Sequence, residues 1–325
     1  MNSLPAVFAR GDQKAIEEVA RYEGTYWIEH NVIMEYNMEM TTTTINASKT
    51  WDMPIIDAYG KECPSITGEG ITAVVLDSGL EAGHPDLDLG EKTVKNYKSD
   101  SDFVWREVEN SDTSSGHGTH CAGTVAGNGD ASGGARAGVA IGAKLIGLST
   151  GEAISIFNGL GGLEWVYEHS RPGHTYEWDD PIKVVSNSWG PGPNDYNPND
   201  ALTKICQMIT FDNNVIVVFA ASNSGGEGDV IETNPYGNVP SNINVAAIAR
   251  DGSGVASFSS RGQEGIFTTY PDVGAPGVGI WSTAARRTFI SMSTKSGADL
   301  EDIDPYYFAI SGTSMATPHI AGVVA

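Results

Sequence analysis

Residues 71–79 read ITAVVLDSG, and this stretch decides the fold. Every residue from Ile71 to Leu76 is apolar or β-branched, which is typical of a strand buried on both faces. Asp77 follows the strand directly, and Ser78-Gly79 then turns the chain. The stretch predicts one strand of a parallel sheet, with a carboxylate at its carboxyl end.

Runs of the same kind recur along the chain and alternate with helical patterns. The strand-like runs are 144–148, 183–186, 215–221 and 243–248, and the helical runs are 117–126, 154–168 and 200–211. This alternation predicts an α/β fold with a mainly parallel central sheet. Functional residues of such sheets gather at the carboxyl ends of the strands.

The N-terminal part has a different character. Residues 13–22 predict a short helix, and residues 25–29 and 31–36 predict two strands. The polar, Thr-rich segment 37–46 shows no strong periodicity, so we expect an extended linker there.

The two ends of the sequence bear on its extent. The first ten residues lack the basic start and long apolar stretch of a signal peptide. A helical pattern begins near Ser314 and still runs at Ala325, so we expect the natural domain to continue beyond this residue. We divide the chain into a small N-terminal segment with its linker, 1–45, and a large domain, 46–325.

Charge restricts the partners of this chain. It has 41 acidic and 19 basic residues, for a net charge of -22. Like-charge repulsion makes nucleic acids and anionic membranes poor partners. A surface suited to high salt, a device for solubility and a set of cation sites would each explain the acidity. No run of 18 apolar residues occurs, so we expect no membrane-spanning helix.

The three cysteines, Cys63, Cys121 and Cys206, do not form a disulfide scaffold. Their odd count leaves at least one free thiol. A pairing of Cys63 with Cys206 stays open, because spacing alone cannot decide it.

A histidine between two glycines is the first catalytic candidate. Residues 116–123 read GHGTHCAG, and the flanking glycines leave the ring of His117 accessible at a loop-to-helix junction. His117 is a candidate general base, and Asp77 is the candidate carboxylate that would orient its ring. His120 keeps a zinc site open as an alternative. Cys121 has the apolar neighbours of a buried residue rather than those of a nucleophile.

A serine and an asparagine complete the set of candidates. Residues 311–319 read SGTSMATPH, which places Ser314 at the start of a helix, where amide donors are free and Pro318 is tolerated in the first turns. Asn223 follows a buried run and can donate its side-chain amide to a developing oxyanion, beside the Ser314 N–H. Helix capping and turn formation are the common structural reasons for such residues.

Together these four segments resemble the Asp, His, oxyanion Asn and Ser motifs of the subtilisin-like serine proteases, in that family's chain order. The resemblance covers about 51–325, and its His motif is most similar to the proteinase K-like branch. It implies a three-layer fold and an endopeptidase in which Ser314 attacks, His117 is the base and Asp77 orients the base. Asn223 then binds the oxyanion, and no cofactor takes part in the chemistry.

Further positions fit the same resemblance. Ser188-Trp189-Gly190 and Ala220-Ala221-Ser222 resemble the two walls of the pocket for the substrate residue before the scissile bond. Residues 150–154 resemble an edge strand that pairs with the substrate, and 272–277 resemble a structural signature. The small wall residues imply a broad preference for apolar or aromatic side chains. Ser222 replaces a glycine of the family, which strains the turn if its φ is positive.

The resemblance extends to processing and to metal binding. Residues 26–36 resemble the last strands of an inhibitory propeptide, which the enzyme itself would cut between Asn37 and Thr50. Secretion and a monomeric state are implied as well. Asp86 matches a calcium-ligand position of some relatives, but loop 128–136 lacks their longer Asn-rich segment, so Asp86 is a weak candidate. Structural calcium elsewhere is compatible with the acidity.

Two other functions would use the same residues. An acyl transferase that joins or cyclises peptides needs a large insertion that excludes water, and none is evident. A catalytically inactive, protease-like binding module is the other alternative, although all four catalytic positions are intact. We expect polypeptide substrates and the chain's own propeptide as partners.

Overall fold

The computed structural model describes residues 12–25, 39–56, 60, 62–63, 65–99, 104–151, 155–175, 177–295 and 304–325. The chain divides into two units, Met1–Tyr36 and Asn37–Ala325. In the first unit, helix α1 (Gln13–Ala20) begins after Asp12, whose side chain accepts a hydrogen bond from the Ala15 N–H at 2.8 Å. The expected helix is thus confirmed. The strands expected at 25–29 and 31–36 lie outside the described residues, apart from Thr25, which is not in a strand.

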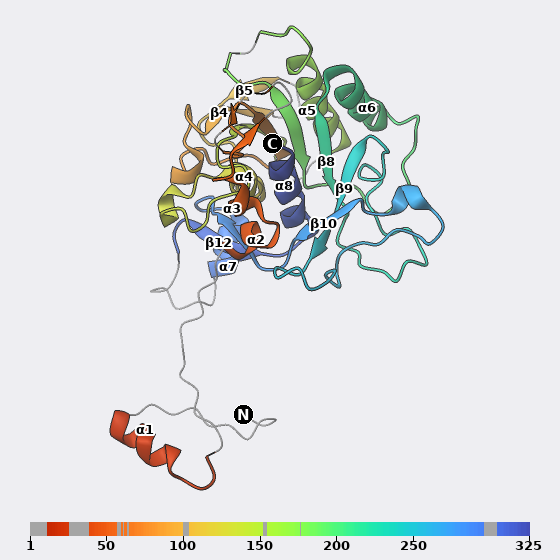
Figure 1. The fold of residues 1–325 in the computed structure, drawn as a ribbon. Coiled ribbons are helices and arrows are strands. Elements are labelled where there is room, and N and C mark those ends of the chain that lie inside the picture. The colour runs from red at the N-terminus through yellow and green to blue at the C-terminus, as the bar shows by residue number, and fades with distance from the viewer. Residues whose placement is uncertain are drawn as a thin grey trace. The chain divides into compact units, whose positions relative to one another are not determined.

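An eight-stranded sheet forms the centre of the larger unit (Figure 1). Its strand order is β10-β9-β8-β7-β3-β6-β4-β5, and every pair is parallel except β4 with β5. The strands are β3 (Thr72–Asp77), β4 (Thr93–Ser99), β5 (Trp105–Glu107), β6 (Lys144–Ser149), β7 (Ile182–Asn187), β8 (Ile216–Ala220), β9 (Asn242–Ile248) and β10 (Val273–Pro276). The mainly parallel sheet predicted from the sequence is confirmed.

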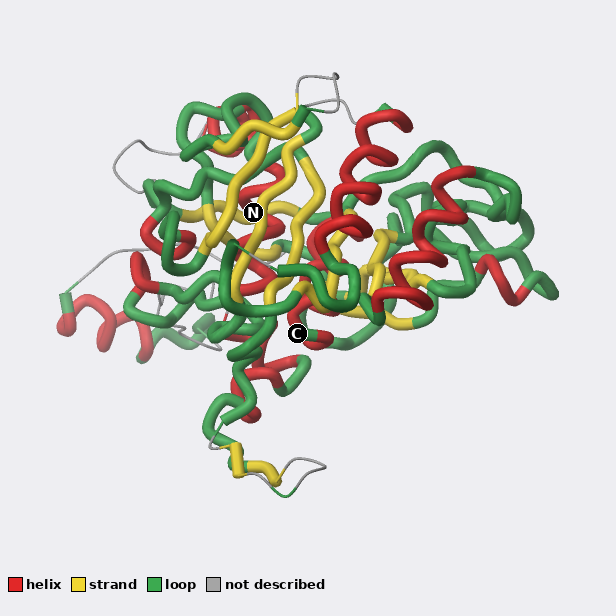
Figure 2. Tube along the Cα trace, turned by 90° about the horizontal axis from the view of Figure 1, so that it is seen from above, coloured by secondary structure: helices red, strands yellow, loops and turns green. Residues whose placement is uncertain are grey.

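Helices cover both faces of this sheet, and the views in Figures 1 and 2 show them on either side. Helices α4 (His117–Ala126) and α8 (Thr313–Val324) pack on one face, and α5 (Ile156–His169) and α6 (Ala201–Asn213) pack on the other. The layers separate the apolar interior into two cores, one on each side of the sheet.

Strand β3 supplies side chains to both cores. Ala73 and Val75 belong to the core beneath α4 and α8, and Val74 and Leu76 belong to the core beneath α5 and α6. Full burial of such a valine or leucine side chain contributes about 1.5–3 kcal/mol. Burial on both faces explains the uninterrupted apolar run, and it fixes Asp77 at the end of the most central strand.

Three strands of the central sheet escaped the sequence analysis, namely β4, β5 and β10. Strand β4 reads TVKNYKS, and its buried residues are the polar Thr93, Asn96 and Ser99. Strand β10 reads VGAP, and its glycine and proline are residues that sequence patterns rarely assign to a strand. None of these segments carries the apolar pattern on which a prediction depends.

The segment expected to be an extended linker is helical instead. Helix α2 (Glu39–Thr44) has Thr41 and Thr42 buried, and the Thr44 hydroxyl donates to the Arg250 carbonyl at 2.9 Å. Threonine is a weak helix former, so the pattern alone did not indicate a helix. Helix α2 is part of the larger unit. Its burial against the rest of that unit outweighs the low helix propensity of threonine.

The remaining elements are short. They are α3 (Ala47–Thr50), α7 (Phe289–Lys295), the antiparallel pairs β1 (Ile55–Ile56) with β2 (Glu62–Cys63) and β11 (Ile280–Thr283) with β12 (Tyr307–Ile310), and the 3₁₀ turns η1 (Pro85–Leu87), η2 (Asp130–Ser132) and η3 (Phe267–Thr269). Among the described residues, no helix is long and apolar enough to cross a membrane. Cys206 is a free, buried thiol, so the disulfide considered for it is not formed.

Candidate active site

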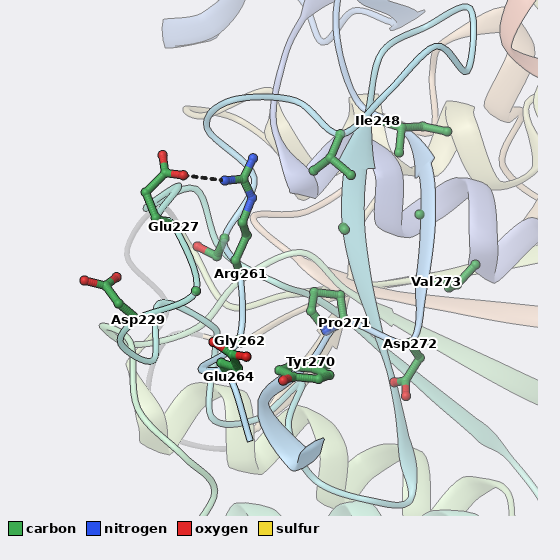
Figure 3. A pocket seen from close by; sticks show the side chains of 15 residues that line it. Glu227, Asp229, Ile248, Arg261, Gly262, Glu264, Tyr270, Pro271, Asp272 and Val273 are labelled. Carbon is green, nitrogen blue, oxygen red and sulfur yellow. Dashed lines mark ion pairs between the residues drawn. The ribbon is translucent and has the colours of Figure 1, made fainter. Parts of the chain in front are cut away.

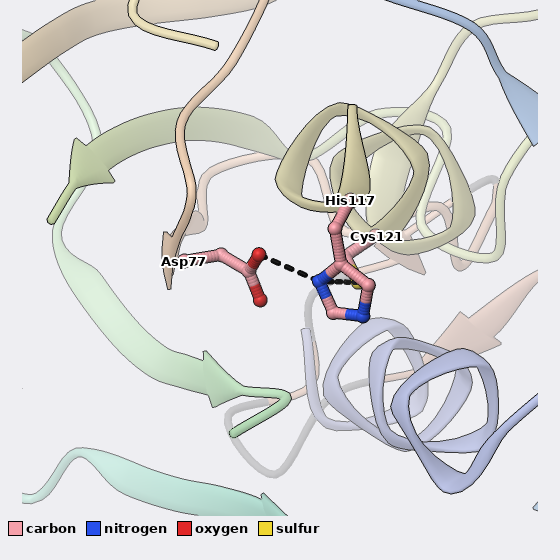
Figure 4. A group of neighbouring side chains, drawn as sticks. All are labelled: Asp77, His117 and Cys121. Carbon is pink, nitrogen blue, oxygen red and sulfur yellow. Dashed lines mark hydrogen bonds and ion pairs between the residues drawn. The ribbon is translucent and has the colours of Figure 1, made fainter. Parts of the chain in front are cut away.

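Asp77 stands at the carboxyl end of β3 and is only 2% exposed. Its Oδ1 accepts hydrogen bonds from the Ser78 N–H and from Nδ1 of His117, each at 2.7 Å (Figure 4). Among the described residues, its Oδ2 has no hydrogen-bond partner. A buried carboxylate so placed holds the imidazole in one orientation and leaves Nε2 free to face a substrate.

Glycines bring His117 to this carboxylate. Gly116 precedes helix α4 with φ 88°, a left-handed conformation that glycine adopts without strain. A Cβ on Gly118 would lie 2.3 Å from the carbonyl oxygen of Gly79, so the helix start packs directly on the turn after Asp77. The imidazole keeps 25% of its side-chain surface exposed, which leaves it open to a reacting group.

The electrostatic balance favours a charged His117. Burial by itself lowers the pKa of this histidine, but the Asp77 carboxylate, 2.7 Å from Nδ1, outweighs burial and raises the pKa well above 6.5. A base with a raised pKa accepts a proton readily once it is neutral.

The loop before His117 is held by Asp112, a residue that the sequence analysis missed. Its Oδ1 accepts the Gly116 N–H at 2.8 Å, and its Oδ2 accepts the N–H and hydroxyl of Thr119 at 3.1 and 2.7 Å. Desolvation raises the pKa of Asp112, although these hydrogen bonds oppose that shift. Nothing in the local sequence singles out Asp112 from the other 40 acidic residues.

Cys121 and His120 take structural positions on α4. The Cys121 Sγ lies 3.9 Å from His117 Nδ1, and with Asp77 these ligand atoms lie within 4.8 Å of one another. Burial raises the pKa of the Cys121 thiol, which keeps it protonated. His120 is buried against Phe308, and its Nε2–H donates to the Ile280 carbonyl at 2.9 Å. The ring of His120 is thus engaged in the core and is not paired with His117.

Ser314 is the second residue of α8 and is partly exposed. Its hydroxyl donates to the Ser188 carbonyl at 3.1 Å, and no hydrogen bond to His117 is formed in the described part of the chain. Attack would require the hydroxyl to turn from Ser188 toward the imidazole. In enzymes without substrate such contacts are often not yet made.

Pro318 lies deeper in α8 than the sequence analysis expected, at its sixth residue. It has no N–H, so the Ser314 carbonyl loses its usual helical partner. That carbonyl instead accepts the Ser188 hydroxyl at 2.9 Å and contacts the Cys121 Sγ at 3.5 Å. The carbonyl freed by the proline therefore connects the nucleophile candidate to Ser188, the residue after β7, and to helix α4.

Asn223 and Ser314 come together at the start of α8. The Asn223 Oδ1 accepts the N–H and the hydroxyl of Thr313 at 2.8 and 3.0 Å. These bonds fix the amide plane and leave the Nδ2 donor free to meet an oxyanion. Ser222, just before it, has φ 91°, so the strain anticipated for a non-glycine residue is present.

The two proposed pocket walls follow β7 and β8, and Asn234 joins them. Its Nδ2 donates to the carbonyls of Trp189 and Ala220 at 3.0 and 2.9 Å. A Cβ on Gly190 would lie 2.3 Å from the same amide nitrogen. The sequence analysis missed Asn234, because its contacts reach residues that are 45 and 14 positions away. The edge strand expected at 150–154 lies largely outside the described residues.

The surroundings of Asp86 do not fit a calcium ligand. Its Oδ1 accepts the Ala131 N–H at 2.9 Å, and its Oδ2 accepts the Tyr307 hydroxyl at 2.6 Å. The Arg136 guanidinium lies 4.8 Å from the centre of the Tyr307 ring. Calcium requires several oxygen ligands that point inward, whereas here hydrogen-bond donors occupy both carboxylate oxygens.

A separate pocket of about 740 Å³ lies beside β9 and β10 (Figure 3). Arg261 forms an ion pair with Glu227 at 3.6 Å at its rim, and Tyr270 and Val273 line its apolar side. None of the four catalytic candidates lines this pocket. The candidate active site lies instead around His117 and Asp77, at the carboxyl end of β3.

Comparisons with known proteins agree with this geometry. The family model described as "Subtilase family" matches residues 68–325. Serine protease AprX of Bacillus subtilis (strain 168) is 34% identical over 272 residues, which are 80% of this chain and 57% of that protein. Subtilisin E of the same strain is 29% identical over 326 residues, which are 98% of this chain and 69% of that protein.

Two solved structures are similar as well. The S41 psychrophilic protease has a TM-score of 0.60 and 27% identity, with 79% of this chain and 76% of that chain covered. Sphericase has a TM-score of 0.56, the same identity and the same coverage.

Proposed function

This chain belongs to the subtilase family, and from that premise we propose that it is a serine endopeptidase that uses Asp77, His117 and Ser314 as its catalytic triad. The observation that carries the proposal is the 2.7 Å hydrogen bond between the buried Asp77 carboxylate and His117 Nδ1. It supplies an oriented, basic imidazole on helix α4. Ser314 stands at the start of α8, which packs on the same face of the sheet as α4. The chain spans 57% of the length of AprX, so the activity of the whole protein is part of the proposal.

The proposed reaction begins at Ser314. Its hydroxyl attacks the carbonyl carbon of the scissile bond, and His117 Nε2 takes the proton. Asp77 holds the tautomer and stabilises the charged imidazole. His117 then gives the proton to the leaving amine, and an acyl-enzyme on Ser314 remains. Water, activated by His117, releases the acyl product.

The oxyanion of the tetrahedral intermediate is assigned to the Asn223 amide and the Ser314 N–H. The hydrogen bonds from Thr313 to Asn223 Oδ1 support this role, because they preorganise the amide before substrate arrives. Preorganised donors need no rearrangement at the moment of reaction. They stabilise the charge that develops there and not the neutral substrate.

Substrate preference is proposed to be broad, with apolar or aromatic side chains favoured before the scissile bond. The support is the small size of the wall residues Gly190 and Ala221, which follow β7 and β8. A library of peptides that varies this single position is the test. Strict selectivity for arginine or aspartate would refute it.

The N-terminal segment 1–45 is proposed to act as an intramolecular inhibitor that is cut between Asn37 and Thr50. Helices α2 and α3 fall in this interval, and proteases bind extended chains, so the segment must unwind before it is cut. Secretion belongs to the same proposal. Structural calcium away from Asp86 is also proposed, and thermal unfolding with and without chelator tests it.

Hydrolysis of an unfolded protein substrate tests the proposed function. We expect internal fragments from the unaltered chain and none above background from Ser314→Ala. Asn223→Ala should lower kcat by about 10²–10³-fold with little change in KM, since its amide acts on the transition state. Equal activity of the unaltered chain and Ser314→Ala would refute the proposal.

A further inference from the structure

Helix α7 exposes two large apolar side chains close to the general base candidate. Phe289 is 72% exposed and Met292 is 59% exposed. The two residues are three positions apart, so they lie on one face of the helix. Neighbouring exposed apolar side chains mark interaction sites, whereas isolated ones are common on any surface.

This helix is bonded to the segment that leads into His117. The Phe289 N–H donates to the Ser114 carbonyl at 2.7 Å, and the Ile290 N–H donates to the Ser115 carbonyl at 3.1 Å. A Cβ on Gly116 would lie 2.4 Å from the Thr288 hydroxyl oxygen. The start of α7 is thus in contact with the residues immediately before the base.

The position of α7 is also fixed from the other side. The backbone N–H and the guanidinium of Arg286 both donate to the carboxylate of Glu81, which is only 2% exposed. The Thr288 N–H donates to the Ser291 hydroxyl at 3.1 Å, which closes the first turn. Anchored elements present their side chains with little loss of entropy on binding.

The contact of α7 with the segment before His117 indicates which half of a substrate would meet this helix. Asn223 and the pocket walls belong to other segments, which follow β8 and β7. The start of α7 is bonded to Ser114 and Ser115, which lead into His117. Because His117 protonates the leaving amine, the chain beyond the scissile bond passes over its ring.

We infer that Phe289 and Met292 form an apolar subsite for the leaving half of the polypeptide substrate. It would take an apolar side chain from the first three residues after the scissile bond. The inference rests on the proposed function and adds to it, because it assigns a source of specificity outside the two pocket walls.

Peptides that share the acyl half but differ after the scissile bond test the inference. One carries leucine and phenylalanine there and the other carries serines, and a p-nitroanilide with the same acyl half has no residues beyond the bond. We expect the unaltered chain to prefer the apolar peptide by about tenfold in kcat/KM. The double variant Phe289→Ser with Met292→Ser should lose this preference and keep its rate on the anilide within about twofold.

Matched variants separate a subsite from a general effect. Phe211, 74% exposed on α6, is altered to serine as a control and should leave the preference unchanged. The double variant Phe289→Leu with Met292→Leu should retain it. Equal preference in the unaltered chain and in the double variant would overturn the inference, as would an equal loss on peptides and anilide. Failure of the unaltered chain to cut even the anilide would instead refute the proposed function and the inference with it.

Discussion

At the scale of residues, the pair of Asp77 and His117 determines how the site depends on pH. In the proposed mechanism His117 must be neutral to take the proton from Ser314, and its pKa is raised well above 6.5. We therefore expect kcat/KM to fall as the pH drops through that raised pKa, with an acid limb that lies above pH 6.5. A pH–rate profile on one peptide substrate measures this limb directly.

Asp77→Asn tests the cause of that raised pKa. The asparagine removes the charge that stabilises the imidazolium, so the acid limb should move to lower pH. It also favours the wrong tautomer, so kcat should fall by about 10⁴-fold. An unchanged limb in the variant would show that the Asp77 carboxylate does not set the pKa of His117.

Ser222 carries strain that a single substitution should release. Its φ of 91° is unfavourable for any residue with a side chain. Ser222→Gly should raise the free energy of unfolding by about 1 kcal/mol, while Ser222→Ala should not. Denaturant unfolding of the three proteins compares them. If Ser222→Ala stabilised the protein as much as Ser222→Gly, the source of the strain would be the serine hydroxyl and not the backbone conformation.

At the scale of elements, the ends of β7 and β8 depend on Asn234. Asn234→Ala removes both hydrogen bonds to the Trp189 and Ala220 carbonyls, and the Ala220 residue is only 4% exposed. We expect a loss of about 1–3 kcal/mol of stability. Discrimination among residues before the scissile bond should weaken too, as a peptide library would show. A variant that is destabilised but equally selective would contradict a role of Asn234 in fixing the two walls relative to each other.

The elements that were predicted correctly share one property, namely that a single apolar pattern dictates each of them. Strand β3 and helix α4 are examples, because burial on fixed faces leaves a readable period. Helix α2 was missed, since contacts with the distant Arg250 stabilise a Thr-rich segment. Asn234 and Asp112 were missed for the same reason: they act by hydrogen bonds that only the folded chain brings together.

The four catalytic candidates could be proposed from the sequence because their motifs combine a reactive residue with small neighbouring residues. Gly116 and Gly118 permit the close contacts around His117, so their presence in the sequence already carried geometric information. The hydrogen bond from the Ser314 hydroxyl to the Ser188 carbonyl could not be predicted from the sequence in this way. The rotamer of a hydroxyl depends on the acceptors around it, and here the acceptor is the carbonyl of Ser188, 126 positions away in the sequence.

At the scale of the whole molecule, two buried histidines limit stability in acid. Burial lowers the pKa of His120 to about 3 and that of His319 to about 4, so both stay neutral in the folded protein. They take up protons only on unfolding. Their contribution to stability is complete above pH 6.5 and is lost as the pH falls toward those values.

We expect each of these histidines to add about 1.4 kcal/mol per pH unit to the loss of stability below pH 6. Denaturant unfolding between pH 7 and 4.5 measures the slope. His319→Gln, which cannot gain a proton, should make the slope shallower by that amount. The exposed His174→Gln should leave it unaltered, and equal slopes for all three proteins would contradict the assignment.

The central claim is that Ser314 is a nucleophile activated by His117 and Asp77. Its most direct test is reaction of the folded chain with a fluorophosphonate, followed by mass spectrometry of the proteolytic fragments. We predict a single adduct on Ser314, none in Ser314→Ala, and much slower formation in Asp77→Asn. A folded chain that stays unmodified, or that carries its adduct on another residue, would contradict the account.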